Sequence, residues 1–437
     1  MLNYAEHIAT KSAIYAGALA AGNFDYAIIS AGCLIYRFND DLDYPFRPSS
    51  YFNEWVPLQD RPGGYLLIQP GERPRLLLPE AGGFWDSLPE AIPAPVLDVV
   101  DVIGYQDADD CRLHLAGKGR GVWIGPSDPI SEQLDGLVKN PEAVLNVVDF
   151  NRAYKSDYER SCLRSASQRA AVGHQAAKAA FYSGASELDI HLAYLGASRT
   201  ADEELPYRNI IALNENAATL HHMARAKAAP ETIRSFLIDA GASCAGYAAD
   251  VSRTYVAENE AMSVFAQLVA DLDRGQQQLV AAVDTVATFP ELHQRAHTLI
   301  TQLLVDHNIV QCGVDEALAS GASRVFFPHG LGHLLGIQVH DRGGFLAAAD
   351  GSVAAPPKEH PHLRLTRSIE PGMVFTVEPG LYFIPALLAG FDQQSLLNKS
   401  LIDQLTPFGG IRIEDNVAVT TTGVENLTRD AFSAFEA

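Results

Sequence analysis

Two acidic residues stand in a stretch with the pattern of a β-hairpin. In SFLIDAGASCAGYAADVSRTYV (235–256), two β-prone segments flank a turn of small residues. With the turn centred on Cys244 and Ala245, Asp239 pairs with Asp250, and their Cβ atoms lie about 5 Å apart. Opposed carboxylates repel each other and are costly to desolvate, so this pairing predicts a cation between them. In the alternative, a register slip places them on different faces or in solvent.

Two further acids interrupt apolar segments near the C-terminal end. Glu378 stands in MVFTVEPGLYF, just before Pro-Gly, and Glu414 stands in GGIRIEDNVAVT. Acids inside buried strands rarely lack a partner, although a single Glu of this kind is more often a strand-end residue at the surface. Together with the aspartates, they make four candidate ligands.

Three histidines lie in the segment HGLGHLLGIQVHD (329–341). His329 and His333 are four residues apart, a spacing that on a helix would suggest a zinc-type pair, but Gly330 and Gly332 favour a loop. The two rings therefore need not share a role. A lone histidine in an apolar segment is more often a hydrogen-bonded core residue, but a glycine-rich cluster in a chain with four strand-embedded acids favours a ligand.

Four carboxylates and one imidazole suit a pair of hard or borderline divalent ions. Four negative ligands nearly balance two dications, and a bridging hydroxide would complete the shell. In such sites the ions lie about 3.5–4 Å apart and lower the pKa of bound water toward about 7. This donor set predicts a hydrolase with a water-derived nucleophile, and no serine or cysteine stands in a GxSxG-type setting.

The surrounding segments divide the chain into two regions. Apolar segments such as DYAIIS (25–30), GYLLIQ (64–69), PRLLLP (74–79) and GVWIGP (121–126) predict strands of an α/β region, and AGKGRG (116–121) predicts a turn before the last of them. The segment 155–184 has helical spacing and ends at Gly184, and a second helix begins after Ser186. The 437 residues are too many for one compact core. We therefore expect an N-terminal α/β domain (1–150) and a larger α+β domain (151–437).

Charge and composition exclude several classes of protein. A formal net charge of -21 argues against a nucleic-acid surface, which needs clustered Lys and Arg, and favours a multivalent cation site. The five cysteines form no CxxC pair, which fits a reducing compartment. The start MLNYAEHIATK does not resemble a signal peptide, and no segment approaches the roughly 20 apolar residues of a membrane span. We expect a cytoplasmic protein without membrane or nucleic-acid partners.

Four strings resemble the signature of the metal-dependent pita-bread peptidases. They are LIDAGASCAGYAADVSRTY, HGLGHLLGIQVHD, FTVEPGLYF and FGGIRIEDNVAV. Three more, at 43–57, 205–223 and 425–430, resemble the bacterial prolidase (Xaa-Pro dipeptidase) branch, including relatives that hydrolyse organophosphorus acid anhydrides. The resemblance covers nearly the whole chain. It implies an α+β pita-bread catalytic domain, with an N-terminal domain that dimerises and caps the active site.

The resemblance also implies roles for individual residues. The ligands of two ions, usually Mn²⁺, with Co²⁺ or Zn²⁺ as alternatives, would be Asp239, Asp250, His333, Glu378 and Glu414. His329 would stabilise the reacting group or shuttle a proton, while His340 and His221 would line the substrate pocket. Ser252 and Leu334 depart from the threonine and proline common in relatives, without removing a ligand.

Arg412 is the candidate for binding the substrate carboxylate. Strand residues alternate faces, so Arg412 and Glu414 project to the same side, where a guanidinium can clamp a dipeptide's free C-terminus. Alternatively, Arg412 pairs with a metal-ligand acid, and both interpretations can hold. We expect hydroxide to attack the scissile carbonyl of Xaa-Pro, His329 to stabilise the oxyanion, and Glu378 to relay a proton to the proline nitrogen.

The resemblance places other residues around the substrate. Asp41 or Asp43, in FNDDLDYPF (38–46), would reach a neighbouring subunit's active site across a homodimer and meet the substrate's ammonium group; the plain alternative is a solvated loop. Tyr207 would form a pocket wall, and Val339 would shape the proline subsite.

Three alternative functions compete with a prolidase. An aminopeptidase P-like exopeptidase shares the metal centre and accepts longer peptides. A metal-free binding module and a creatinase-like hydrolase would both lack the ligands present here. A side activity on organophosphate triesters is compatible with two ions and an activated hydroxide.

Overall fold

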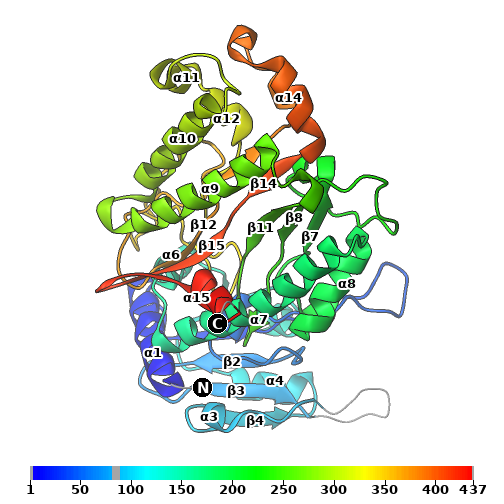
Figure 1. Cartoon of the computed structure of the whole chain (residues 1–437). Coiled ribbons are helices and arrows are strands. Elements are labelled where there is room, and N and C mark those ends of the chain that lie inside the picture. Colours follow the sequence, from blue (N-terminus) through cyan, green and yellow to red (C-terminus); the bar gives the residue numbers. More distant parts are fainter. Residues whose placement is uncertain (1–2, 81–88, 436–437) are drawn as a thin grey trace. The chain divides into compact units, whose positions relative to one another are not determined.

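The computed structural model describes residues 3–80 and 89–435, which form two compact units (Figure 1). One unit contains the chain up to residue 162 together with residues 346–353. The other contains residues 163–345 and the chain from residue 354 onward. The boundary falls within a long helix, α7 (Asp157–Tyr182).

The first unit is built on a six-stranded mixed sheet. Its strands are β1 (Tyr26–Ser30), β2 (Tyr65–Ile68), β3 (Arg75–Pro79), β4 (Asp101–Tyr105), β5 (Gly121–Ile124) and β6 (Val138–Lys139), in the order β4-β3-β2-β1-β5-β6. The pairs β1–β2 and β2–β3 are antiparallel, and the others are parallel. All four apolar segments predicted as strands are confirmed. The two strands at the edges, β4 and β6, are largely exposed and therefore lack that apolar pattern.

Helices complete the first unit. They are α1 (Tyr4–Ala21), α2 (Ser50–Asn53), α3 (Ala94–Leu97), α4 (Ala108–Leu115), α5 (Pro129–Gln133) and α6 (Glu142–Arg152). The long helix α1 packs against α6. From α4, Cys111 and Leu115 pack against Ile28 and Trp123 of the sheet. The glycine-rich segment 116–121 forms the turn predicted before β5.

In the second unit, two helices cover a three-stranded antiparallel sheet (Figure 1). The helices are α7 and α8 (Glu187–Ser198), and the strands are β7 (Ile210–Leu213), β8 (Ser235–Asp239) and β11 (Ser252–Val256), in the order β11-β8-β7. Gly184 (φ 81°) follows the end of α7, and the Ser186 side chain caps α8 by accepting from the Asp189 N–H, as the sequence predicts. Buried Phe181 of α7 stacks on Phe236 of β8 at 5.2 Å between ring centroids.

A second helix-covered sheet makes up the rest of this unit. Its strands are β12 (Val374–Val377), β15 (Asp415–Thr420) and β16 (Gly423–Asn426), beside the pair β13 (Gly380–Tyr382) and β14 (Gly410–Arg412). The helices are α9 (Val264–Ala281), α10 (Phe289–Asp306), α11 (Val314–Ser320), α12 (Ala322–Phe326), α13 (Pro385–Ala389), α14 (Lys399–Leu405) and α15 (Leu427–Ser433). Phe289 of α10 packs edge-on against Phe375 of β12, so α10 lies on this sheet.

The hairpin that carries both aspartates has a different register from the predicted one. Its tip is formed by β9 (Ser243–Cys244) and β10 (Tyr247–Ala248), joined by Ala245 (φ 52°) and Gly246 (φ 85°). Two positive φ values are typical of a type I′ turn, so the turn lies one residue later than expected. Asp239 consequently pairs with Ser252, and the predicted pairing with Asp250 is wrong.

The same-face relationship of the aspartates survives this correction. A shift of one residue in the turn moves the cross-strand partner by two residues, which preserves the side of the ladder on which a side chain lies. Asp250 therefore lies diagonally across from Asp239.

Candidate active site

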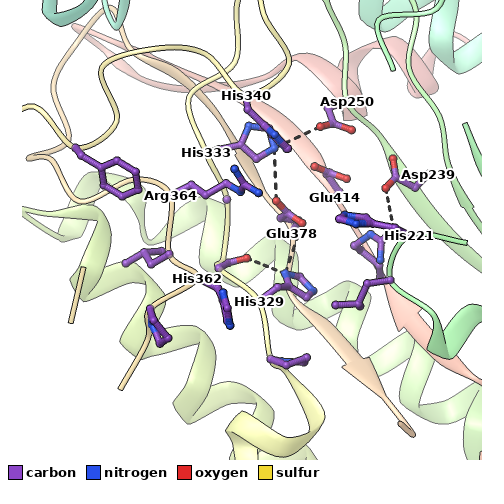
Figure 2. A pocket seen from close by; sticks show the side chains of 18 residues that line it. His221, Asp239, Asp250, His329, His333, His340, His362, Arg364, Glu378 and Glu414 are labelled. Atoms are coloured by element: carbon purple, nitrogen blue, oxygen red, sulfur yellow. Dashed lines mark hydrogen bonds and ion pairs between the residues drawn. The ribbon is translucent and has the colours of Figure 1, made fainter. Parts of the chain in front are cut away.

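Five side chains from separate strands and loops converge on one cavity of about 510 Å³ in the second unit (Figure 2). They are Asp239 at the end of β8, Asp250 after β10, His333 in the loop after α12, Glu378 directly after β12, and Glu414 between β14 and β15. Ligand atoms of Asp250, His333 and Glu414 lie within 4.8 Å of one another. The structure thus brings together all five predicted metal ligands.

His333 is oriented as a metal-binding imidazole would be. Its Nδ1 lies 3.0 Å from the Leu334 carbonyl oxygen, to which it donates. Its Nε2 faces the acids, at 3.4 Å from Asp250 Oδ2 and 3.6 Å from Glu378 Oε1. A carbonyl that holds one ring nitrogen leaves the other nitrogen's lone pair for a ligand bond. Leu334 contributes through its backbone, so the departure from proline keeps this contact.

The acids of the cavity carry more negative charge than the nearby side chains neutralise. Burial and then the charge of Asp250 raise the pKa of Glu414 well above its usual value. Burial also raises the pKa of Glu378 to about 7, although His333 opposes the shift. Asp239 Oδ1 is buried and has no hydrogen-bond partner within residues 3–80 and 89–435.

These donors fit a pair of divalent cations. Clustered buried carboxylates with raised pKa values repel one another, and a bound dication removes that repulsion. An unpartnered buried carboxylate oxygen is costly unless a cation completes its shell. Four carboxylates and one oriented imidazole form an oxygen-rich donor set that suits Mn²⁺ and related ions.

The loop that carries His329 and His333 needs glycine for close packing. It has no helical turn, as the sequence predicts. A Cβ on Gly332 would lie 2.0 Å from the Thr376 carbonyl oxygen of β12, and one on Gly330 would lie 2.9 Å from the His362 carbonyl oxygen. Any larger residue would push the loop away from β12 and displace His333 from the acids.

His329 is a part-buried, neutral imidazole held beside the acids. Burial, and then the charge of Arg412, lowers its pKa to about 3. Its Nδ1 donates to the Gly330 carbonyl at 2.8 Å and lies 3.7 Å from Glu378 Oε2. Its Nε2 accepts from the Tyr382 hydroxyl at 2.9 Å, and this hydroxyl accepts from Arg412 Nη1 at 2.9 Å. Tyr382 and this hydrogen-bond chain were not predicted from the sequence.

Arg412 is held by protein partners on all sides of its guanidinium. It is 4% exposed, its Nη2 donates to Asp239 Oδ2 at 2.7 Å, and its Nε donates to Ser252 Oγ at 3.0 Å. Ser252 in turn donates to Glu414 Oε2 at 2.6 Å, so Arg412 and Glu414 do project to the same side. The alternative interpretation, in which Arg412 pairs with a ligand acid, therefore describes this structure. Arg412 also lines the cavity.

Arg364 lines the same cavity and was missed by sequence reasoning. It is exposed, and within the described parts of the chain its side chain makes no hydrogen bond or ion pair. Figure 2 shows its guanidinium directed toward the acids, between His362 and His333. No local pattern in HLRLTR distinguishes Arg364 from a surface arginine, so only the fold reveals it.

His221 and His340 line the cavity, as predicted. The His340 ring packs edge-on against His333, at 4.4 Å between ring centroids. Beside His221, the next residue, His222, contacts buried Glu187 at 3.1 Å, and Glu187 also accepts from the Leu213 and Ala226 N–H groups. Glu187 thereby fixes both ends of the loop that presents His221.

Two predicted substrate contacts do not line the cavity in this structure. Tyr207 lies behind the aspartates: its ring packs beside Gly241, and its pKa is raised by burial and by the charges of Asp239 and Asp250. Val339 is half-buried beside His340. For Tyr207, packing against Gly241 holds the ring outside the space predicted for it.

Asp41 and Asp43 belong to the first unit. They lie in a short exposed hairpin closed by a bridge between Tyr36 and Asp43. This placement fits a solvated loop, and their contact with substrate remains a proposal.

Comparisons with known proteins agree on one family. Residues 161–421 match the model of metallopeptidase family M24, and residues 2–150 match that of the Xaa-Pro dipeptidase N-terminal domain. Xaa-Pro dipeptidase of Edwardsiella ictaluri is 43% identical over 98% of both chains, and that of Shewanella pealeana is 40% identical over 98% of this chain and 97% of its own.

Solved structures share the fold at lower sequence identity. Escherichia coli aminopeptidase P with the inhibitor Pro-Leu superposes with a TM-score of 0.71 at 22% identity, over 93% of this chain and 91% of its own. Proline aminopeptidase P II of Yersinia pestis superposes with a TM-score of 0.67 at 23% identity, over 96% of both chains. The predicted α+β pita-bread fold is confirmed. The chain belongs to metallopeptidase family M24 and carries the N-terminal domain typical of Xaa-Pro dipeptidases.

Proposed function

We propose that this chain is a metal-dependent dipeptidase that hydrolyses Xaa-Pro dipeptides with a free C-terminal carboxylate. The observation that carries the proposal is the convergence of five ligand side chains on one cavity that also holds an exposed arginine. Relatives at 40–43% identity over nearly the whole chain are named Xaa-Pro dipeptidase. Asp239, Asp250, His333, Glu378 and Glu414 would hold two divalent ions. When bound, the ions supply Lewis acidity and lower the pKa of water.

The chain's own residues would move the proton. Glu378 faces the cavity with His329 Nδ1 3.7 Å from its Oε2. Glu378 takes the proton from the attacking water as the new C–O bond forms, and passes it to the proline nitrogen as the C–N bond breaks. In this arrangement the neutral His329 donates its N–H to the Gly330 carbonyl and holds the Tyr382 hydroxyl through Nε2. To stabilise the polarised carbonyl group, His329 would turn its N–H from Gly330 to the substrate oxygen without itself becoming charged.

Arg364 is the better candidate for the carboxylate clamp. Arg412 already satisfies Asp239, Ser252 and Tyr382, so a substrate would have to displace one of these partners. Arg364 is exposed in the cavity and can offer a bidentate fork without such a loss. His221 and His340 would form the walls around the dipeptide.

Other features of the expected enzyme are proposals as well. The oxygen-rich ligand set supports Mn²⁺ as the bound ion, with Co²⁺ or Zn²⁺ as substitutes. The N-terminal domain (1–150) would support a homodimer, in which Asp41 or Asp43 meets the substrate's ammonium group. We propose a cytoplasmic location. Within residues 3–80 and 89–435, no helix combines the length and the apolar character that a membrane-spanning helix needs. Organophosphate triesters would be secondary substrates.

A hydrolysis panel on chelator-stripped protein tests the proposal. Mn²⁺, Co²⁺ and Zn²⁺ are added back in turn, and turnover is measured for Ala-Pro, Ala-Pro-amide, Ala-Ala-Pro and a pentapeptide with proline second. We expect metal-dependent cleavage of Ala-Pro and poor cleavage of the other three. Preferential cleavage of the pentapeptide would instead identify an aminopeptidase P-like exopeptidase. Full-length protein that binds no metal would identify a binding module.

A further inference from the structure

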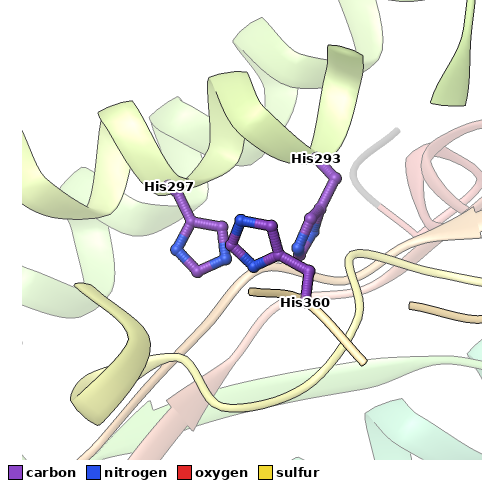
Figure 3. Close-up of side chains that lie close together, drawn as sticks. All are labelled: His293, His297 and His360. Carbon is purple, nitrogen blue, oxygen red and sulfur yellow. The ribbon is translucent and has the colours of Figure 1, made fainter. Parts of the chain in front are cut away.

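Three histidines outside the active site face one another in a second cavity of about 210 Å³ (Figure 3). His293 and His297 project from α10, and His360 comes from the loop before β12. One ring nitrogen of each lies within 4.8 Å of the others. A tetrahedral zinc ion with Zn–N bonds of about 2.0–2.1 Å holds its ligand nitrogens about 3.4 Å apart, so small side-chain rotations would close this cluster around an ion.

The helix makes two of these ligands a preformed pair. Residues four apart lie on the same face of a helix, one turn above the other. The His293 and His297 rings are edge-on, at 4.6 Å between ring centroids, and His360 lies 4.5 Å and 4.3 Å from them. The string HQRAH (293–297) therefore indicates the pair in the sequence. The third histidine of the cluster, His360, lies far along the chain and has no such local signal.

The buried ring nitrogens have unmet bonding capacity. His293 and His297 are 1% and 2% exposed. Neither nitrogen of His293 has a hydrogen-bond partner within the described residues, and His297 Nε2 likewise has none there. His297 Nδ1 lies 3.0 Å from Ser323 Oγ, and when it donates to this oxygen the Nε2 lone pair is left for a ligand bond. Buried polar atoms without partners are costly and rare, so something absent from the polypeptide is expected to satisfy them.

We infer that His293, His297 and His360 bind a divalent ion of borderline softness, such as Zn²⁺. A site of three neutral imidazoles selects Zn²⁺, Ni²⁺ or Cu²⁺ over Mn²⁺, which prefers oxygen ligands. The three-histidine site therefore prefers a different metal ion from the carboxylate-rich active site. Burial keeps His293 and His297 neutral near pH 7, which leaves their nitrogens available. Arg324 and Glu359 also line the cavity and bring charges of opposite sign.

The ion would act on the wall of the active site. His360 lies in a turn in which its N–H donates to Pro357 O and its carbonyl accepts from Leu363 N–H. The segment from Pro361 to Leu363 lines both cavities, as does His329. An ion shared by His360 and α10 would tie this segment to the helix and restrict its motion beside His329.

Metal binding by a variant without a functional active site tests this inference separately from the proposed activity. Asp250→Asn/Glu414→Gln removes two of the four carboxylates assigned to the active-site ions, both of them in the group whose ligand atoms lie within 4.8 Å of one another. We expect this full-length variant to retain one zinc per chain by elemental analysis, and zinc to raise its Tm. X-ray absorption at the zinc edge should show nitrogen ligands of the imidazole type.

Single substitutions in that background assign the zinc to the cluster. His297→Gln and His360→Asn should each weaken zinc binding by at least about tenfold and abolish the rise in Tm. His360 is only half-buried, so His360→Asn remains informative if His297→Gln fails to fold. His307→Gln is the matched control, because His307 caps the same helix and contacts Asp271 instead. Equal zinc affinity in all these variants, or no zinc in the parent variant, would overturn the inference.

Discussion

Replacing Arg364 by methionine should remove the cation that we place against the proline carboxylate. A hydrogen bond to a charged partner contributes about 1.5–3 kcal/mol. Arg364 is exposed, and solvent screens its interaction, so we expect the lower part of this range, about 1.5–2 kcal/mol. This corresponds to a decrease in kcat/KM for Ala-Pro of about 12- to 30-fold.

The substrate provides the second half of a double-mutant cycle. Ala-Pro-amide lacks the carboxylate, so Arg364→Met should barely change its kcat/KM. The preference for Ala-Pro over Ala-Pro-amide should therefore fall by the same 12- to 30-fold (about 1.5–2 kcal/mol) in the variant. Initial rates on both substrates, in wild type and variant loaded with the same metal, measure the coupling.

Two controls separate substrate binding from structural damage. Arg274→Met removes a cation that is paired with Asp271 on the surface and should leave both rates unchanged. Arg412→Met should lower the Tm of the chelator-stripped protein, because it leaves the part-buried carboxylate of Asp239 without its cationic partner, a loss that costs up to about 3–5 kcal/mol. If Arg364→Met keeps the wild-type preference for Ala-Pro over its amide, the carboxylate does not bind Arg364 and our reasoning is refuted.

Three further perturbations have expected outcomes. Glu414→Gln should lower both the metal bound per chain and the rate; two ions held at full affinity would contradict its role as a ligand. Gly332→Ala should lower the free energy of unfolding in urea by about 3 kcal/mol or more, because the added Cβ meets the Thr376 carbonyl oxygen. The control Gly196→Ala places its Cβ in open space on helix α8 and should be neutral or stabilising. Burial lowers the pKa of His174 to about 3 in the folded state. Its unfolded pKa is near 6.5, so its stabilising contribution is present above pH 6.5 and lost as the pH falls below it. Between pH 6.5 and 4.5, His174→Gln should therefore lose about 2–3 kcal/mol less unfolding free energy than wild type; equal losses would show that this histidine is not the source.

The candidate ligands could be found from sequence because each carries a local anomaly. Glu378 and Glu414 are acids at the ends of buried strands, next to continuous apolar residues, and Gly330 and Gly332 exclude a helix around His333. Hydrophobic patterning likewise predicted the inner strands of the N-terminal sheet, because burial on both faces demands continuous apolar residues. Edge strands β4 and β6 lack that demand and escaped prediction.

The hairpin register depended on one backbone conformation. Ala245 adopts φ 52°, a region that residues other than glycine rarely enter, and this shifts the turn and gives Asp239 a new partner, Ser252. Local propensity favours no such conformation for alanine. The contacts of the packed hairpin stabilise this conformation of Ala245. The residue type alone was too weak a signal to predict it.

The amino-acid sequence by itself determined which chemistry this protein can perform, because the types and local settings of its acids and histidines define a metal-binding donor set. Only the tertiary structure decided how cations and rings are distributed around that set. It buries Arg412 against Asp239, exposes Arg364 to the cavity, turns Tyr207 away, and brings His360 to His293 and His297. These placements depend on contacts between segments that are far apart in the chain. The surroundings of each side chain are set by how whole helices and sheets pack, and the residues next to it in sequence do not reveal them.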